Sequence, residues 1–265
     1  MSGYAYDSGF FDFVDASSGR SASAFLEVVA SEISPQSVLD VGCGRGVWLA
    51  AWAGRGVRDL LGVDGDYVDR NHLKIAPAQF RAHDLTGTLA LDRQFDLVQC
   101  LEVAEHIEAA HADRLIDNLV KHGDVILFSA AIPGQGGEFH VNEQPVSYWA
   151  EKFRARGYLP FDYPRQQVRD ITVIEPWYRY NVLLYVRASA VSRLSEVVRR
   201  TEIRSGEAIP DYSPFLWRLR CRLLSLLPRC AIHQLARLKH FLNTFSKPQM
   251  GKSCQPLPPP PVCRF

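Results

Sequence analysis

A glycine-rich segment of the sequence has the spacing of a ligand-binding turn. Residues 38–46 read Val-Leu-Asp-Val-Gly-Cys-Gly-Arg-Gly, so that an apolar run ends in Gly42, Gly44 and Gly46. Glycine allows the backbone to turn tightly and to approach a ligand closely, and a following helix offers free N–H groups at its N-terminus. The segment therefore predicts a bound nucleotide-like group. Its GxGxG spacing differs from the GxGxxG pattern that places a pyrophosphate on a helix.

Two carboxylates follow at the ends of the next apolar runs. Asp64 closes the run Leu-Gly-Val-Asp, about 20 residues past the glycines, where a carboxylate can accept hydrogen bonds from ribose hydroxyls. Asp84 closes the run Phe-Arg-Ala-His-Asp and could accept from an adenine amino group, with Leu85 supplying a backbone N–H. A fourth apolar run ends at Leu101, which we also expect beside the cofactor. Together these residues predict a site for an adenosine-containing group.

A second set of polar residues comes directly after the fourth run and after the fifth. Its members are Glu102, Glu105, His106 and His140. On a helix, spacings of three and four place the first three on one face. Two carboxylates and two imidazoles could hold Mg²⁺ or Mn²⁺, which would lower the pKa of a substrate hydroxyl.

The same four residues also allow interpretations that involve no metal ion. His140 could act as a general base, because imidazole titrates near neutral pH. Glu143 is close enough in sequence to orient it, or is a polar loop residue. His106 could line an acceptor pocket, and Glu105 and His106 could simply open a helix, whose dipole favours an acid there.

Strand-like and helix-like segments alternate through the first 186 residues. This alternation predicts an α/β fold, a Rossmann-like, doubly wound and mostly parallel sheet. Late strands at 158–161 and 181–186 predict an antiparallel edge strand. Expected helices lie at 23–33, 46–54, 66–73, 104–121 and 146–156. Ligands of such folds bind at the carboxyl edge of the sheet, where the glycines and acids above would meet.

The four blocks, in this order and spacing, resemble the class I S-adenosylmethionine-dependent methyltransferases over roughly residues 20–187. The resemblance implies S-adenosylmethionine as cofactor. It places the three glycines beside the methionine moiety, Asp40 at the methionine amine, Asp64 on the ribose and Asp84 on the adenine. A domain that binds NAD is the alternative, although the glycine spacing does not suit a pyrophosphate.

The Glu-x-x-Glu-His set with a later histidine resembles that of metal-dependent 2′-O-methyltransferases of small-RNA 3′ ends, and ubiquinone-pathway O-methyltransferases look similar there. The resemblance implies four metal ligands, namely Glu102, Glu105, His106 and His140. Residues 134–150 resemble methyltransferases of bacterial surface-glycan assembly, which implies an acceptor hydroxyl on a sugar, glycan or other small polyol. Metal-independent N- or C-methyl transfer and a non-catalytic docking module remain the alternatives.

Charge divides the chain into unlike parts. Residues 187–265 hold 14 Lys and Arg against 4 Asp and Glu, whereas the preceding residues hold 16 against 25. We predict a catalytic domain at 1–187, a basic helical extension at 188–246 and a disordered Pro-rich tail at 247–265. The acidic catalytic part disfavours RNA as substrate, and the extension has no recognisable RNA-binding motif.

The extension and the cysteines bear on location. Residues 215–227 have the pattern of a basic amphipathic helix on an anionic membrane, or of a helix that packs on the main domain or a partner. None of the six cysteines forms a CxxC pair, and Cys43 and Cys100 lie in apolar runs, as free thiols of a reducing cytoplasm do. Residues 1–13 lack the pattern of a signal peptide. We expect a cytoplasmic protein, membrane-peripheral if residues 215–227 adsorb.

Overall fold

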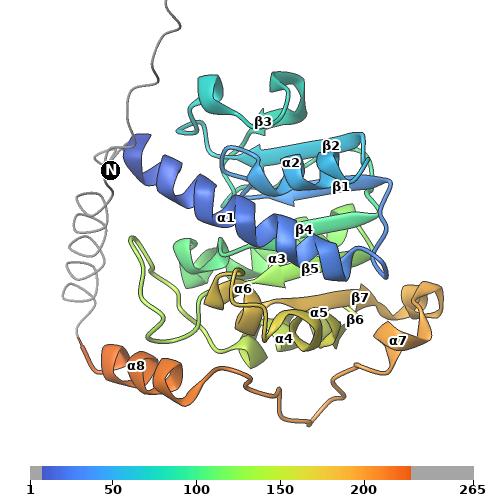
Figure 1. Cartoon of the computed structure of the whole chain (residues 1–265). Helices are drawn as coiled ribbons and strands as arrows, with labels where there is room; N and C mark the ends of the chain where they lie inside the picture. Colours follow the sequence, from blue (N-terminus) through green and yellow to red (C-terminus); the bar gives the residue numbers. More distant parts are fainter. Residues whose placement is uncertain (1–7, 228–265) are drawn as a thin grey trace, which may run out of the picture.

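A seven-stranded sheet forms the centre of the molecule (Figure 1). The structure, a computed structural model, describes residues 8–227, with side chains from Asp15 onward except Ala16. The strands are β1 (Ser37–Val41), β2 (Asp59–Asp64), β3 (Phe80–Ala82), β4 (Leu97–Leu101), β5 (Val125–Ser129), β6 (Tyr158–Phe161) and β7 (Leu183–Arg187). Their order is β3-β2-β1-β4-β5-β7-β6, and β7 runs antiparallel to both of its neighbours. The predicted mostly parallel sheet with an antiparallel strand near one edge is confirmed.

Helices cover both faces of the sheet. They are α1 (Ser8–Val29), α2 (Val47–Gly54), α3 (Ala112–His122), α4 (Val146–Arg154), α5 (Tyr163–Val168), α6 (Pro176–Asn181), α7 (Glu196–Arg199) and α8 (Phe215–Ser225). Successive strand residues point to opposite faces. Leu97 accordingly joins the core beneath α1, α2 and α5, whereas Val98 joins the core beneath α3 and α4.

One predicted helix is wrong and another is shorter than predicted, and local polar contacts explain the first difference. Residues 66–73 form only a 3₁₀ turn at Arg70–His72, because the Asp69 carboxylate accepts from the backbone N–H of Asn71 and contacts the His72 ring. The helix expected at 104–121 begins only at Ala112, after two 3₁₀ turns.

The extension packs on the sheet domain. Val198 and Ile203 are buried in the two cores, and the Tyr212 hydroxyl donates to the Asp162 carboxylate over 2.8 Å. Ser195 separates a 3₁₀ segment from the short α7 by accepting from the Val198 N–H, as N-cap residues do. Residues 228–246 of the predicted helical extension and the Pro-rich tail lie outside the described residues.

Cys43 and Cys100 are buried free thiols, as predicted. Burial raises the pKa of both thiols well above the ordinary value. Within residues 8–227, no helix combines the length and the apolarity that a bilayer crossing requires.

Candidate active site

The glycine turn and the Glu/His segment meet where the strand order reverses. β1 and β4 are neighbours, and the chain leaves both at the same edge of the sheet. Gly42 has φ +84°, and a Cβ added to it would lie 2.3 Å from Cγ2 of Val103. Only glycine therefore lets the turn after β1 pass so close to the segment after β4. This reversal is the position where open α/β sheets bind their ligands.

Asp64 ties the end of β2 to the glycine turn. Its Oδ2 accepts from the Gly44 N–H over 2.7 Å, and its Oδ1 accepts from the Gly65 N–H and the Tyr67 hydroxyl, both over 2.6 Å. Among the described residues, no heavy atom beyond the two chain neighbours lies within 4 Å of a Cβ built on Gly44. The buried carboxylate thus borders open space beside the turn, which fits the predicted ribose contact.

Asp40 is a buried carboxylate inside β1, with 3% of its surface exposed. Burial raises its pKa to about 7, the neighbouring Gln99 amide opposes the shift, and the charge of Asp64 adds to it. A carboxyl whose pKa lies near 7 becomes fully ionised when a cation approaches it, because the opposite charge stabilises the carboxylate. The arrangement fits the predicted contact with an ammonium group.

The other predicted cofactor residues lie at the ends of β3 and β4. Asp84 is exposed, and its Oδ1 accepts from the hydroxyl and the N–H of Thr86, which lowers the pKa of the carboxyl. Leu85 and Leu101 are buried. Gly46 ends the turn and caps α2 with φ +83°. Adenine contacts by Asp84 and Leu85 remain predictions.

An ion pair that the sequence did not indicate joins α1 to the glycine turn. Arg45 is buried, and its Nη1 lies 3.2 Å from Oδ2 of Asp15. Lys74 Nζ lies 3.7 Å from the same oxygen. Farther along α1, the Ser18 and Tyr178 hydroxyls are 3.3 Å apart, and Tyr178 is buried.

The Glu-x-x-Glu-His segment is not the single helix face that its spacing predicted. Glu102 has φ +56°, a rare value for a non-glycine residue, and the chain then forms a 3₁₀ turn at Ala104–His106. Even so, single ligand atoms of Glu105, His106 and His140 all lie within 4.8 Å of one another. Glu102 is not part of that group. The structure therefore assembles three of the four predicted metal ligands.

Glu102 is instead held by an amide network. Its Oε2 accepts from Nε2 of Gln135 over 2.7 Å, and Oε1 of Gln135 accepts from Nδ2 of Asn181 over 2.8 Å. The Glu102 N–H donates to the Ser129 carbonyl over 3.1 Å. Burial raises the pKa of Glu102, against hydrogen bonds that favour the charged form. No sequence pattern indicates this network, because its members come from separate segments of the chain.

His140 is held by Glu143. Its Nδ1 lies 2.8 Å from Glu143 Oε1, and the two carboxylate oxygens also accept from the N–H groups of Gly134 and Gly136, each over 2.8 Å. Burial pushes the pKa of Glu143 upward, but these hydrogen bonds outweigh it and hold the pKa below the ordinary value. The predicted orienting contact is thus present. Nδ1 donates to the carboxylate, which leaves Nε2 of the neutral ring as the acceptor.

The other two members of the cluster lie beside His140. The His106 and His140 rings meet edge to face with centroids 4.9 Å apart. His106 is an exposed residue by its accessible surface, and the protein atoms packed around its ring, together with the neighbouring His140, lower the pKa of His106 to about 4. Burial, and then the charge of Glu102, raise the pKa of Glu105 well above its ordinary value. The Glu105 carbonyl accepts from the N–H groups of Val141 and Asn142, so it fixes the loop that carries His140.

Two observations show that the cluster of Glu105, His106 and His140 has groups suited to bind a metal ion. Oε2 of Glu105 is buried and has no hydrogen-bond partner within the described chain. Each imidazole has one nitrogen held by the protein, His140 by Glu143 and His106 by the Phe139 carbonyl. This is the usual arrangement of metal-binding histidines, in which an outer acceptor fixes the ring and the other nitrogen binds the ion.

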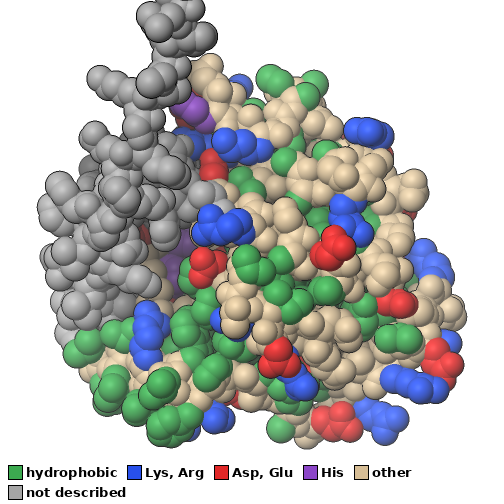
Figure 2. Space-filling model, viewed as in Figure 1, with side chains coloured by type: hydrophobic (Ala, Val, Ile, Leu, Met, Phe, Trp, Pro, Cys, Tyr) green, Lys and Arg blue, Asp and Glu red, His purple; other side chains and the backbone are tan. Residues whose placement is uncertain are grey.

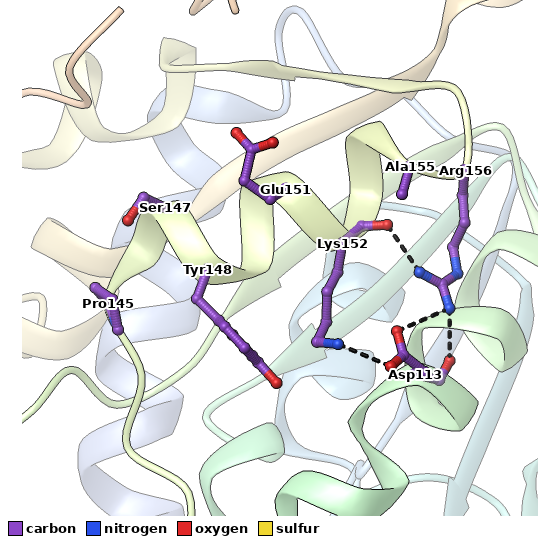
Figure 3. A pocket seen from close by; sticks show the side chains of 8 residues that line it. All are labelled: Asp113, Pro145, Ser147, Tyr148, Glu151, Lys152, Ala155 and Arg156. Atoms are coloured by element: carbon purple, nitrogen blue, oxygen red, sulfur yellow. Dashed lines mark hydrogen bonds and ion pairs between the residues drawn. The ribbon is translucent and has the colours of Figure 1, made fainter. Parts of the chain in front are cut away.

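A surface pocket lies elsewhere, along α4 (Figure 3). Lys152 and Arg156 line it, and both form ion pairs with Asp113 of α3. Its charged groups are therefore engaged in ion pairs, since Glu151, which also lines it, pairs with Arg154. None of the glycine-turn, acidic or histidine residues described above lines it.

Comparison with known proteins decides the family. Residues 17–161 match the family described as methyltransferase domain. The chain belongs to this family. Its fold and glycine turn are those of a class I S-adenosylmethionine-dependent methyltransferase, as the sequence predicted.

The similar curated proteins share only part of their length with this methyltransferase. It is 30% identical over 133 residues to the ubiquinone biosynthesis O-methyltransferase of Acinetobacter baylyi, covering 47% of this chain and 51% of that protein. It is 35% identical over 101 residues to the protein of the same name from Rickettsia typhi, covering 35% and 38%. The methyltransferase thus spans about half or less of these relatives.

Solved structures confirm the fold. The sugar N-methyltransferase KedS8 from Streptoalloteichus superposes with a TM-score of 0.55 at 17% identity, covering 71% of this chain and 95% of that chain. DesVI of Streptomyces venezuelae superposes with a TM-score of 0.50 at 14% identity, covering 70% and 100%. At these identities the likeness concerns the fold alone.

Proposed function

We propose that this methyltransferase transfers the methyl group of S-adenosylmethionine to a hydroxyl of a sugar, a glycan or another small polyol. The observation that carries the proposal is the cluster of Glu105, His106 and His140, with His140 oriented by Glu143. A hydroxyl needs a base or a metal ion before it can attack, because its pKa is high. The relatives named as O-methyltransferases support hydroxyl transfer.

The cofactor residues position the methyl donor. The sulfonium group of S-adenosylmethionine supplies the reactive methyl. In the proposed complex Asp64 accepts from the ribose hydroxyls, Asp84 accepts from the adenine amino group and Asp40 contacts the methionine ammonium. Catalysis then consists largely of holding donor and acceptor in line.

The acceptor residues manage the proton of the hydroxyl. Nε2 of His140 takes this proton as the oxygen attacks the methyl carbon and the carbon–sulfur bond breaks. The products are the methyl ether, S-adenosylhomocysteine and protonated His140. Glu143 then stabilises the imidazolium, because its carboxylate already contacts Nδ1.

A divalent ion such as Mg²⁺ or Mn²⁺ fits the same cluster. It would be held by Glu105, His106 and His140, and it would lower the pKa of the bound hydroxyl. The metal-free alternative uses His140 alone as the base. The contact between His140 and Glu143 is compatible with this second candidate too, because a base with its own orienting carboxylate functions without an ion.

Calorimetric titration with S-adenosylhomocysteine, first with EDTA and then with Mn²⁺, tests the cofactor and the metal separately. Transfer of labelled methyl from S-adenosylmethionine to glycosides, amino sugars and an aromatic diol then tests the acceptor. Labelling of glycosides that EDTA abolishes and Mn²⁺ restores would support metal-assisted O-transfer. EDTA-insensitive labelling of amino sugars only would contradict it. Failure to bind S-adenosylhomocysteine would favour a non-catalytic docking module.

A further inference from the structure

The helix α8 turns an apolar face away from the protein. Ten large hydrophobic side chains are exposed in the described chain, and six of them belong to α8 and the turn that follows it. They are Phe215, Leu216, Leu219, Leu223, Leu226 and Leu227, with exposed fractions from 39% to 80%. Figure 2 shows these green side chains gathered at the lower left of the molecule. A contiguous apolar surface of this kind marks an interaction site.

The apolar side chains form one stripe with basic edges. At 3.6 residues per turn, the six residues fall within an arc of about 120°. Arg218 and Arg222 border one side of the arc and Arg220 borders the other. No Asp or Glu occurs between Phe215 and Leu227. An apolar stripe between arginines is the pattern of a helix that lies in the plane of an anionic bilayer.

The opposite face of α8 packs against the rest of the protein. Cys221 is buried, and its carbonyl oxygen would lie 1.9 Å from a Cβ added to Gly134. Nη1 of Arg220 donates to the Gln135 carbonyl over 3.0 Å, and the Trp217 ring packs against Tyr180. The exposed stripe therefore cannot turn inward without breaking these contacts.

We propose that α8 docks this methyltransferase on a membrane surface that contains anionic lipids. The stripe would enter the boundary between headgroups and acyl chains, while Arg218 and Arg222 contact lipid phosphates. The contact face of α8 rests on Gly134 and Gln135, the loop that holds Glu102 and Glu143. Docking therefore brings the acceptor side of the site to the bilayer surface. If the proposed function holds, the acceptor class is a sugar or polyol carried on a lipid anchor.

Sedimentation of the full chain with vesicles tests the docking. The wild-type protein is expected to bind vesicles of phosphatidylcholine with phosphatidylglycerol, and to bind phosphatidylcholine alone weakly. The double variant Leu216→Glu/Leu223→Glu is expected to lose at least about tenfold in partitioning for each leucine, since burying a leucine contributes about 1.5 kcal/mol or more and about 1.4 kcal/mol corresponds to tenfold. The variant Arg218→Gln/Arg222→Gln is expected to lose about fivefold per arginine.

The matched control is Val173→Glu/Val197→Glu. It replaces two exposed apolar residues outside α8 and makes the same change of charge, and its binding should equal that of the wild type. Titration with S-adenosylhomocysteine in every variant shows whether the catalytic domain is intact. This readout separates a failure of docking from a failure of the proposed function.

Three results would overturn the proposal. The first is no preference of the wild type for anionic vesicles. The second is vesicle binding that Leu216→Glu/Leu223→Glu leaves unchanged, which would assign adsorption to another segment, including residues 228–265. The third is a dimer in the absence of lipid that the same variant dissociates, because a second copy would then cover the stripe.

Discussion

Nδ1 of His140 and Oε1 of Glu143 lie 2.8 Å apart, and the Glu143 carboxylate also receives the backbone N–H groups of Gly134 and Gly136. One largely buried acid thus fixes both the imidazole and the loop on which α8 rests. Its position makes Glu143 a positioning residue, because it acts on the acceptor through His140.

Replacing Glu143 should weaken metal binding without affecting the cofactor. The variant Glu143→Gln keeps the size of the side chain but removes the charge that favours the Nδ1–H tautomer. We expect Mn²⁺ affinity to fall about 10- to 100-fold, with unchanged affinity for S-adenosylhomocysteine. Calorimetry measures both. Glu151→Gln, at an exposed residue paired with Arg154, is the control. Equal Mn²⁺ affinity in the two variants would remove Glu143 from the site.

Asp64 should carry much of the cofactor affinity. In Asp64→Asn, the carboxylate loses its charge and one of its acceptor oxygens, and the amide competes for the Gly44 N–H. Loss of two hydrogen bonds to a charged group, at about 1.5 kcal/mol each, predicts a fall of about 100-fold or more in affinity for S-adenosylhomocysteine. Asp66→Asn removes a neighbouring exposed carboxylate and should leave affinity unchanged. Equal affinities in the two variants would contradict the ribose contact.

Two glycines of the turn should respond differently to alanine. Gly42→Ala forces a left-handed residue and places a methyl group against Val103, so it should lower the free energy of unfolding by about 2–5 kcal/mol. Gly44 has φ +53°, and no other described residue has an atom within 4 Å of a Cβ placed there, its chain neighbours aside. Gly44→Ala should therefore lower the free energy of unfolding by only about 1–2 kcal/mol, while its methyl group obstructs the cofactor. Urea unfolding and cofactor titration measure the two effects. Equal losses of stability would show that Val103 moves aside.

The raised pKa of Asp40 predicts a pH dependence of stability. Because the folded protein binds this proton more tightly than the unfolded chain, the contribution of Asp40 to stability is greatest below the ordinary pKa of 3.8 and decreases until the pH passes about 7. Asp40→Asn removes this decrease. Relative to the wild type, it should gain about 4 kcal/mol at most between pH 3.5 and pH 8. Urea unfolding at several pH values measures the difference, and a difference independent of pH would show that the pKa of Asp40 is the same in the folded and the unfolded chain.

Cofactor binding should release the same proton. If the methionine ammonium contacts Asp40, the carboxyl becomes ionised in the complex, so affinity should increase with pH up to about 7 and then level off. Calorimetry at pH 6 in buffers of different ionisation enthalpy counts the protons released. We expect close to one proton for the wild type and none for Asp40→Asn. No release from the wild type would place the ammonium elsewhere.

The sequence by itself determined the sheet domain and its cofactor edge. Apolar runs that end in glycine or aspartate, alternating with helical periods, leave few arrangements other than parallel strands covered on both faces. The ends of neighbouring parallel strands then meet at one edge, so the amino-acid order alone is enough to place Gly42 and Asp64 together. The local spacing of residues was sufficient because the contacts follow from strand order.

Only the tertiary structure decided the composition of the Glu/His cluster. A helical period predicted one face for Glu102, Glu105 and His106, but the left-handed backbone at Glu102 turns that side chain toward Gln135. The fold then brings His140 to the other two through the Glu105 carbonyl and Glu143. These are contacts between loops, which no periodicity encodes. The outward face of α8 was decided in the same way, since the pattern of residues 215–227 fits a helix with either face buried, and the close approach of Gly134 to Cys221 selects one of them.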